Sequence, residues 1–139
     1  MPKIVIVDTD FKNNDFEVRM AKDAGVDIAL FNEREPEAII RNAADADGVV
    51  TSYGKFPPKV FEALPNLRVV SRTGIGYDDI DVPAATKNGT AVCVVPGYGT
   101  EVASDHAITL ALCVLRRLNE TDADMRAGIW DYACHRPYG

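Results

Sequence analysis

Two glycines one residue apart, Gly74 and Gly76, follow a predicted strand directly. Glycines at this spacing permit a tight turn with exposed backbone N–H groups, and such groups can bind a carboxylate or a phosphate without a charged side chain. Arg72, two residues earlier, could add a positive charge. Asp79 stands where a dinucleotide-binding loop has its third glycine, so the run is not that fingerprint. The spacing predicts an anion-binding turn, with a plain strand-to-loop turn as the alternative.

Hydroxyl groups gather in a second loop, directly after the third predicted strand. Thr51, Ser52 and Tyr53 supply them, and Gly54 and Lys55 follow. Open α/β sheets bind their ligands beyond the carboxyl ends of the strands. Hydroxyls, a glycine and a lysine at that position suit a ligand that carries an acid group. The alternative is a polar loop ahead of the two prolines that come next.

Tyr98 lies between Gly97 and Gly99, after the last predicted strand and before a helix. This position is also at the ligand-binding end of an open sheet. Thr100 is a suitable N-cap for the helix, because its hydroxyl can accept a hydrogen bond from a backbone N–H of the first turn. The same hydroxyl could instead face a cofactor.

Three acids stand close together at Asp78, Asp79 and Asp81. Such a group can bind a cation, but it is more often a turn followed by a helix N-terminus. Asp81 fits the N-cap of a helix at 82–88, which has a proline in its first turn. We therefore predict a structural role for these acids.

Residues that commonly catalyse reactions or bind metals are sparse. Asp105 and His106 adjoin on a helix, where neighbours do not face the same way. No Ser-His-Asp or Cys-His arrangement is recognisable. The three cysteines, Cys93, Cys113 and Cys134, are far apart and lack C-x-x-C spacing, so we expect buried free thiols. We predict no catalytic residue and no metal site in this chain.

Strands and helices alternate through the first hundred residues, with short connections. A buried parallel strand is expected first, at 3–8, because the run is continuously β-branched. The other expected strands lie at 26–31, 48–51, 67–71 and 91–94, and the expected helices at 15–24, 36–44, 59–64 and 82–88. This alternation predicts an α/β fold, with a parallel five-stranded sheet covered by helices on both faces.

A longer helix is expected from Glu101 to about Arg126. Its apolar residues spread over an arc of about 200°, wider than the stripe of roughly 100° on an ordinary surface helix. We therefore expect the helix to bury two faces, one of them against a second subunit or against a domain that this chain lacks. Residues 128–139 have no periodicity and are expected to form a crossover arm.

Composition excludes several classes of protein. The chain has 139 residues, 47% of them hydrophobic, and a formal net charge of −6, which does not suit a general nucleic-acid or anionic-membrane binder. No apolar run reaches the roughly 18 residues of a membrane span. The first residues read as a strand and not as a signal peptide. We predict a cytoplasmic protein without nucleic-acid or membrane partners.

Taken together, these motifs resemble the N-terminal substrate domain of the D-isomer-specific 2-hydroxyacid dehydrogenases. That family includes phosphoglycerate dehydrogenase, D-lactate dehydrogenase and the C-terminal-binding-protein corepressors. Residues 3–50 are compatible with the family but generic. The resemblance is carried by Arg72–Asp81, Ala84–Ala85, Gly89–Val92, Val95–Pro96, Asp105–His106 and Gly128–Trp130.

The resemblance implies a flavodoxin-like domain and assigns roles to the motifs. Backbone around Gly74, Ile75 and Gly76 would hold the substrate carboxylate, and Tyr98 would lie over the substrate. The cofactor, NAD, would be approached by Ile75 and by Thr100. The residues implied to bind the substrate, a small 2-oxo or 2-hydroxy acid, are Ser52, Tyr53, Gly74, Ile75, Gly76 and Tyr98.

The chain also departs from the family. There, the arginine, acid and histidine of the hydride chemistry and the glycine-rich dinucleotide loop lie downstream of the position where this chain ends. The expected organisation is a substrate domain at 1–100, an interdomain or dimerisation helix at 101–127 and a linker arm at 128–139. The dinucleotide-binding domain is absent, so we expect the isolated chain to be inactive. Family members form two-fold dimers, and we expect a homodimer here.

Two other functions are compatible with parts of this sequence. A phosphoacceptor receiver domain has a similar fold, and Asp8 and Asp10 end the first strand as receiver acids do. However, Thr51 and Ser52 stand where the phosphorylated aspartate should be, and Pro96 replaces the lysine after the fifth strand, which argues against this class. A non-enzymatic, corepressor-like interaction module stays open as the alternative.

Overall fold

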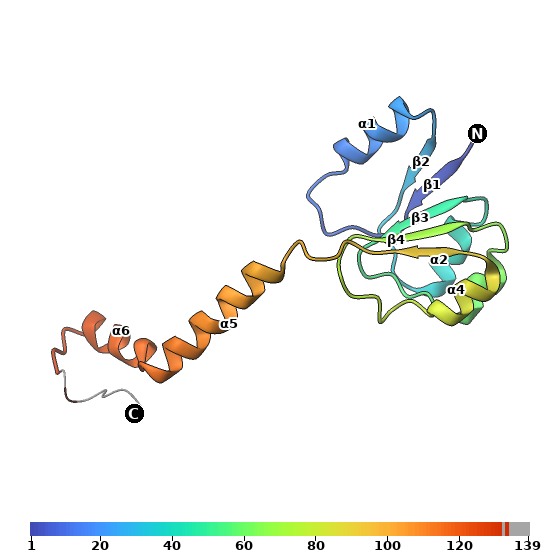
Figure 1. The fold of residues 1–139 in the computed structure, drawn as a ribbon. Coiled ribbons are helices and arrows are strands. Elements are labelled where there is room, and N and C mark those ends of the chain that lie inside the picture. Colours follow the sequence, from blue (N-terminus) through green and yellow to red (C-terminus); the bar gives the residue numbers. More distant parts are fainter. Residues whose placement is uncertain (132, 134–139) are drawn as a thin grey trace. The chain divides into compact units, whose positions relative to one another are not determined.

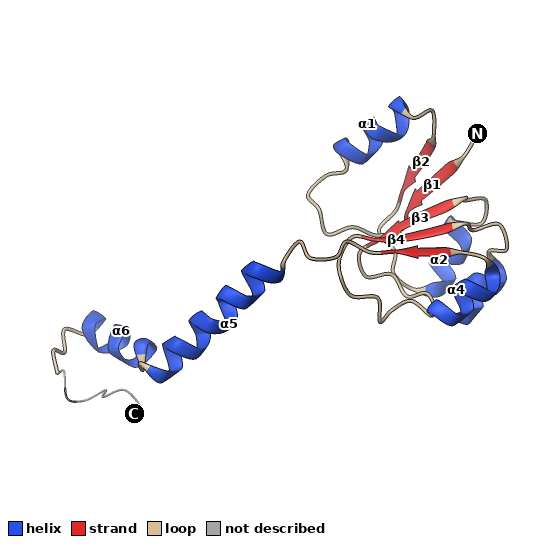
Figure 2. Ribbon diagram, in the orientation of Figure 1, coloured by secondary structure: helices blue, strands red, loops and turns tan. Residues whose placement is uncertain are grey.

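Five short parallel strands form one sheet in the order β2-β1-β3-β4-β5 (Figures 1 and 2). The computed structural model describes residues 1–131 and 133. They divide into two compact units, of which the first ends at Pro96 and the second begins at Gly97. The sheet belongs to the first unit and confirms the predicted flavodoxin-like α/β class. The strands are β1 (Lys3–Ile6), β2 (Asp27–Leu30), β3 (Gly48–Thr51), β4 (Val69–Arg72) and β5 (Ala91–Cys93). The fourth strand begins two residues later than predicted.

Helices cover both faces of this sheet, as predicted. The helices are α1 (Asp15–Asp23), α2 (Pro36–Asn42), α3 (Pro58–Ala63) and α4 (Val82–Asn88). The connection through α1 crosses the sheet in one direction, and the connections through α2, α3 and α4 cross it in the other. Because such crossovers are right-handed, α1 must lie on the opposite face from the other three, as Figure 1 shows for α1, α2 and α4.

The main hydrophobic core lies between the sheet and the face that carries α2, α3 and α4. Val5, Val49 and Val70 stand side by side on three neighbouring strands, and none of them is exposed to solvent. Phe56 and Phe61 pack against this row, with their ring centroids 6.1 Å apart. This core fixes where each strand ends, and therefore where each loop begins.

The strand order reverses between β1 and β3, because the chain leaves β1 toward β2 and then returns to the other side. At such a switch point the loops at the carboxyl ends of the two strands diverge and leave a crevice, where flavodoxin-like sheets bind their ligands. The loops that follow β1, β3 and β4 therefore share this edge of the sheet. They contain the predicted anion-binding turn and the predicted hydroxyl-rich loop.

Local signals around α4 act as predicted. Asp81 caps the helix, since its Oδ1 accepts a hydrogen bond of 2.8 Å from the backbone N–H of Ala84. Gly89 ends the helix in the left-handed conformation, with φ at +77°. Gly25 follows α1 in the same conformation, with φ at +66°. Each glycine lets the chain turn directly into the next strand.

The second unit begins at Gly97, and the continuous helix predicted at 101–126 is wrong. Two helices are present instead, α5 (Thr100–Leu115) and α6 (Leu118–Arg126). Arg117 between them has φ at +52°, a left-handed conformation that interrupts the ladder of helical hydrogen bonds. The prediction of Thr100 as N-cap is also wrong, because Gly99 takes that position and Thr100 is the first helical residue.

The expectation of buried thiols is wrong for the two described cysteines. Cys93 is exposed and Cys113 is half-buried. Cys93 belongs to the three-residue edge strand β5, which has a neighbour on one side only. Cys134 lies outside the described residues. Within the part that the structure describes, no helix has the length and apolar character that a membrane span requires.

Replacement of Gly89 tests the turn after α4. A Cβ at this position would meet no atom within 4 Å, so the cost of a side chain arises only from the positive φ. We expect Gly89→Ala to lower the free energy of unfolding by roughly 1–2 kcal/mol, and Gly89→Asn to lower it less, because asparagine tolerates this conformation. Urea denaturation of both variants measures the difference. Equal losses, or none, would contradict the explanation.

Candidate functional site

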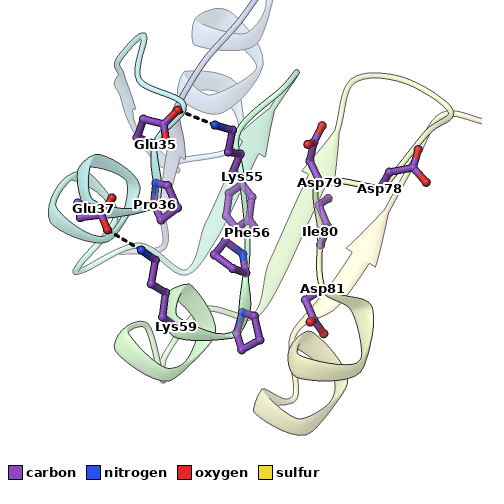
Figure 3. Close-up of a pocket in the computed structure, with 12 residues that line it drawn as sticks. Glu35, Pro36, Glu37, Lys55, Phe56, Lys59, Asp78, Asp79, Ile80 and Asp81 are labelled. Carbon is purple, nitrogen blue, oxygen red and sulfur yellow. Dashed lines mark hydrogen bonds and ion pairs between the residues drawn. The ribbon is translucent and has the colours of Figure 1, made fainter.

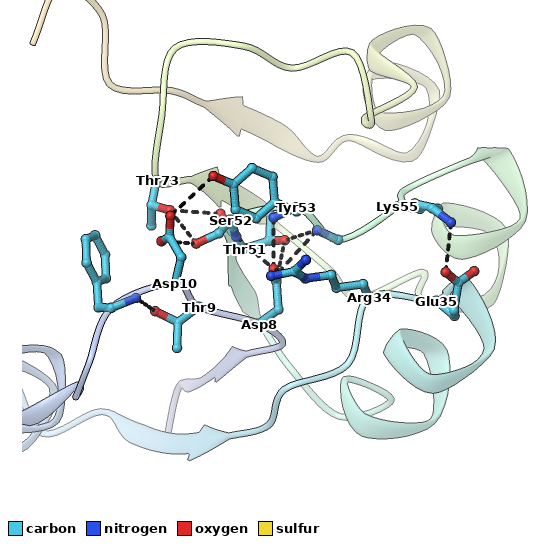
Figure 4. Close-up of polar contacts among 12 residues, drawn as sticks. Asp8, Thr9, Asp10, Arg34, Glu35, Thr51, Ser52, Tyr53, Lys55 and Thr73 are labelled. Carbon is cyan, nitrogen blue, oxygen red and sulfur yellow. Dashed lines mark hydrogen bonds and ion pairs between the residues drawn. The ribbon is translucent and has the colours of Figure 1, made fainter. Parts of the chain in front are cut away.

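A buried carboxylate, that of Asp8, lies at the centre of the polar contacts at the carboxyl edge of the sheet (Figure 4). Its Oδ1 accepts hydrogen bonds from Oγ1 of Thr51 at 2.5 Å and from the backbone N–H groups of Ser52 at 3.0 Å and Gly54 at 3.2 Å. Its Oδ2 accepts one from the backbone N–H of Tyr53 at 2.9 Å. Asp8 therefore binds three consecutive N–H groups of the loop that follows β3.

A guanidinium group balances this buried charge. Nε of Arg34, in the loop after β2, lies 3.2 Å from Oδ2 of Asp8. The same guanidinium stacks over the ring of Tyr53, with its Cζ 4.9 Å from the ring centroid. A buried carboxylate is stable only when it is paired and hydrogen-bonded, and Asp8 meets both conditions.

Hydroxyl groups connect this arrangement to the loop after β4. Oγ of Ser52 donates to Oδ1 of Asp10 at 3.1 Å and lies 2.8 Å from Oγ1 of Thr73. The hydroxyl of Tyr53 donates to Oδ2 of Asp10 at 3.3 Å, and the backbone N–H of Thr73 donates to the carbonyl of Thr51 at 2.9 Å. Loops from three strands are thus held in one network.

The predicted anion-binding turn lies next to this network. Among the described residues, the backbone N–H groups of Gly74, Ile75 and Gly76 have no hydrogen-bond partner. A Cβ on Gly74 would overlap the guanidinium of Arg72, so that side chain lies directly against the turn. Cζ of Arg72 also lies 5.5 Å from the ring centroid of Tyr53. The turn therefore combines unpaired donors with an adjacent positive charge.

The structure brings part of the predicted site together. Ser52, Tyr53 and the turn at 74–76 adjoin, because Ser52 contacts Thr73 and Tyr53 stacks with Arg72. Tyr98 and Thr100 belong to the second unit, where Tyr98 is exposed and Thr100 opens α5.

Several members of the network were not recognised as site residues from the sequence. From the sequence, Asp8 and Asp10 resemble only receiver acids, and Arg34 belongs to the charged stretch 33–35, for which a solvated loop is the prediction and a partner surface the alternative. An acid that directly follows a buried β-branched strand is a usable signal for Asp8. The pairing of Arg34 has no such signal, because it depends on how the loop after β2 packs.

A hollow of about 570 Å³ lies beside α2 and α3, away from this network (Figure 3). Nζ of Lys55 lies 2.7 Å from Glu35, and Nζ of Lys59 lies 2.5 Å from Glu37. The hydrogen bond and charge of Glu35 raise the pKa of Lys55, and the hydrogen bond from Lys59 lowers the pKa of Glu37. The amine of Lys55 is therefore engaged with Glu35 and does not point toward the turn at 74–76.

The residues that the structure describes do not form a cradle for a dinucleotide. Pyrophosphate binds at a helix N-terminus after a glycine-rich loop, where backbone N–H groups face the ligand. Here α4 begins six residues beyond Gly76, and the carboxylate of Asp81 already occupies its N-terminus. In the described part of the chain, no three His, Cys, Asp or Glu side chains are gathered as a metal site requires.

Sequence comparison identifies relatives over most of the chain. Residues 4–130 match the family model "D-isomer specific 2-hydroxyacid dehydrogenase, catalytic domain". A glyoxylate reductase of Korarchaeum cryptofilum is 37% identical over 113 residues, which are 78% of this chain and 34% of that protein. A D-3-phosphoglycerate dehydrogenase of Archaeoglobus fulgidus is 32% identical over 108 residues, which are 77% of this chain and 20% of that protein.

Solved structures agree on the fold. A glyoxylate reductase from Paecilomyes thermophila superposes with a TM-score of 0.80 at 23% identity, over 99% of this chain and 45% of that one. An acyclic imino acid reductase in complex with NADPH and D-Arg superposes with a TM-score of 0.86 at 20% identity, over 98% of this chain and 45% of that one. This chain thus spans less than half the length of these relatives.

Replacement of Gly54 tests how tightly the loop after β3 is packed. A Cβ at Gly54 would lie 2.6 Å from Oγ1 of Thr51 and 3.2 Å from side-chain atoms of Ile39 and Phe56. We expect Gly54→Ala to cost about 1–3 kcal/mol of stability, as overpacked sites do. Gly76→Ala is the matched control, because its Cβ would come no closer than 3.6 Å to Asp78. Urea denaturation that shows equal stability for the two variants would contradict this packing.

Proposed function

Because the chain belongs to the D-isomer-specific 2-hydroxyacid dehydrogenase family, we propose that it is the substrate-binding domain of an NAD-dependent dehydrogenase that interconverts a 2-oxo acid and a D-2-hydroxy acid. The observation that carries the proposal is the turn at 74–76. Its three backbone N–H groups have no partner among the described residues, and Arg72 lies against it. Donors that are already in place bind a carboxylate without the cost of rearrangement.

In this proposal the substrate carboxylate binds the N–H groups of Gly74, Ile75 and Gly76. Tyr53, which is 44% exposed, forms the adjoining wall together with Ser52. The side chain of Ile75, 45% exposed, faces the nicotinamide. We propose that Tyr98 binds the substrate and that Thr100 binds the cofactor; both residues belong to the second unit.

The hydride step itself needs groups beyond this site. A nicotinamide supplies or accepts the hydride, and a general acid or base must lie next to the reacting oxygen. The two acids of the polar network do not serve this purpose, because Asp8 is buried and Asp10 binds Ser52 and Tyr53. We propose that a separate dinucleotide-binding domain provides the catalytic groups, and that the 139-residue chain by itself is inactive.

We further propose that a second copy of the chain covers α5. None of the 16 residues of this helix is buried within the unit. Large apolar side chains are exposed on it, among them Val102, Ile108, Leu112 and Val114. A monomer rarely leaves so much apolar surface in water, and contiguous patches of this kind mark association sites.

Oxamate, an unreactive 2-oxo acid analogue, tests the substrate site. We expect oxamate to shift the amide resonances of Ile75 and Gly76 in the labelled chain. Gly76→Pro removes one donor and should weaken binding about tenfold or more, whereas Gly76→Ala keeps the donor and should bind within a few-fold of the wild type. Binding that is equal in both variants would contradict the proposed site. Turnover of NADH with glyoxylate by the isolated chain would contradict its inactivity.

Light scattering tests the association through α5. We expect the wild-type chain to be a dimer and Leu112→Glu to shift it toward monomer, because a charge cannot be buried in an apolar interface without a partner. Ser104→Glu adds the same charge to a polar position of the same helix and should leave the dimer intact. A wild-type monomer with α5 folded would count against a second copy as the cover.

A further inference from the structure

We propose that Asp8 is a positioning residue, which holds the loop at 52–54 in the conformation that forms the wall of the substrate site. The inference rests on the proposed function, in which Tyr53 faces the substrate and the buried Ser52 supports it from behind. Asp8 itself is fully buried, so its carboxylate is not accessible to a ligand. Its effect on the reaction is therefore exerted through the loop that it binds.

The place of Asp8 in the fold supports this role. Asp8 follows β1, and the loop at 52–54 follows β3, so the two meet where the strand order reverses. Flavodoxin-like sheets bind their ligands in the crevice at this switch point. Three consecutive N–H groups, those of Ser52, Tyr53 and Gly54, converge there, as in a nest that binds a phosphate or carboxylate. In this chain the anion in the nest is the side-chain carboxylate of Asp8.

Because the Asp8 carboxylate occupies the nest, it limits where the carboxylate of a substrate can bind. An external anion cannot bind the N–H groups of 52–54, because they are already satisfied and Ser52 and Gly54 are buried. The unpaired N–H groups lie instead in the next loop along the sheet, at 74–76. With Asp8 in the nest, the donors left for an external anion are those of the loop after β4.

The loop has no substitute for this carboxylate. Without it, the N–H groups of Ser52 and Tyr53 would be left without acceptors and that of Gly54 would keep only Oγ1 of Thr51, which is costly enough to force the loop to rearrange. A rearranged loop at 52–54 would disturb the anion-binding turn through two contacts. Oγ of Ser52 lies 2.8 Å from Oγ1 of Thr73, and the Tyr53 ring stacks with the Arg72 guanidinium that lies against Gly74.

Asp8→Asn is the decisive variant, because it keeps the shape and removes one acceptor. With Oδ1 still bound to its three donors, the new NH₂ group would face the N–H of Tyr53 and Nε of Arg34, both of which are donors. Asp47→Asn is the matched control. Asp47 also accepts from a backbone N–H, that of Lys3 at 2.8 Å, but at the opposite end of the sheet.

Amide hydrogen exchange, unfolding in urea and oxamate titration are measured on the whole chain. We expect Asp8→Asn to speed exchange of the Ser52, Tyr53 and Gly54 amides about tenfold or more and to weaken oxamate binding several-fold. Asp47→Asn should change the free energy of unfolding, but neither the exchange of these amides nor the affinity for oxamate. A folded Asp8→Asn chain with wild-type amides, or with altered amides and unchanged oxamate affinity, overturns the inference.

A second pair of variants decides the matter if Asp8→Asn does not fold. Thr51→Val removes the hydroxyl that donates to Asp8 and accepts from the N–H of Gly54, whereas Thr51→Ser keeps it. We expect the valine variant to loosen the loop amides and the serine variant to restore them, and equal behaviour of the two overturns the inference. If the wild-type chain does not bind oxamate, the proposed function fails, and the loop amides still decide whether Asp8 holds the loop.

Discussion

The structure of the carboxyl edge depends on one buried charge. Among the described residues, Asp8 is the only charged side chain that is buried. A carboxylate without solvent requires a full set of donors, and these come from Thr51, the loop at 52–54 and Arg34. The loops after β1, β2 and β3 are therefore bound to a single group. The hydrogen bonds of Ser52 and Thr73 add the loop after β4 to the same assembly.

The sheet could be predicted from the sequence because its signals are local. A β-branched run at Lys3–Ile6, the glycine after α1 and the cap at Asp81 each act within a few residues, and the structure has the elements that they indicate. The motif at 74–76 was recognisable for the same reason, since two glycines after a strand already define the turn. These features do not depend on the rest of the fold.

The features that could not be predicted depend on tertiary contacts, which the spacing of residues in the sequence does not reveal. Arg34 is 26 residues from Asp8 in the sequence, and only the packing of the loop after β2 brings the two together. The break at Arg117 was equally hidden, because the helical periodicity continues across it while the backbone does not. The division at Pro96 and Gly97 places Tyr98 in the second unit, although its sequence context resembles that of the other loop residues.

The edges of the sheet limit how copies of this chain can assemble. β2 has four residues and β5 has three, so each offers few free backbone groups to a strand of another molecule. Fibril growth by strand addition needs longer and flatter edges than these. A two-fold contact through side chains on α5 would instead produce a closed interface, whose size is set by one helix and which cannot propagate from copy to copy.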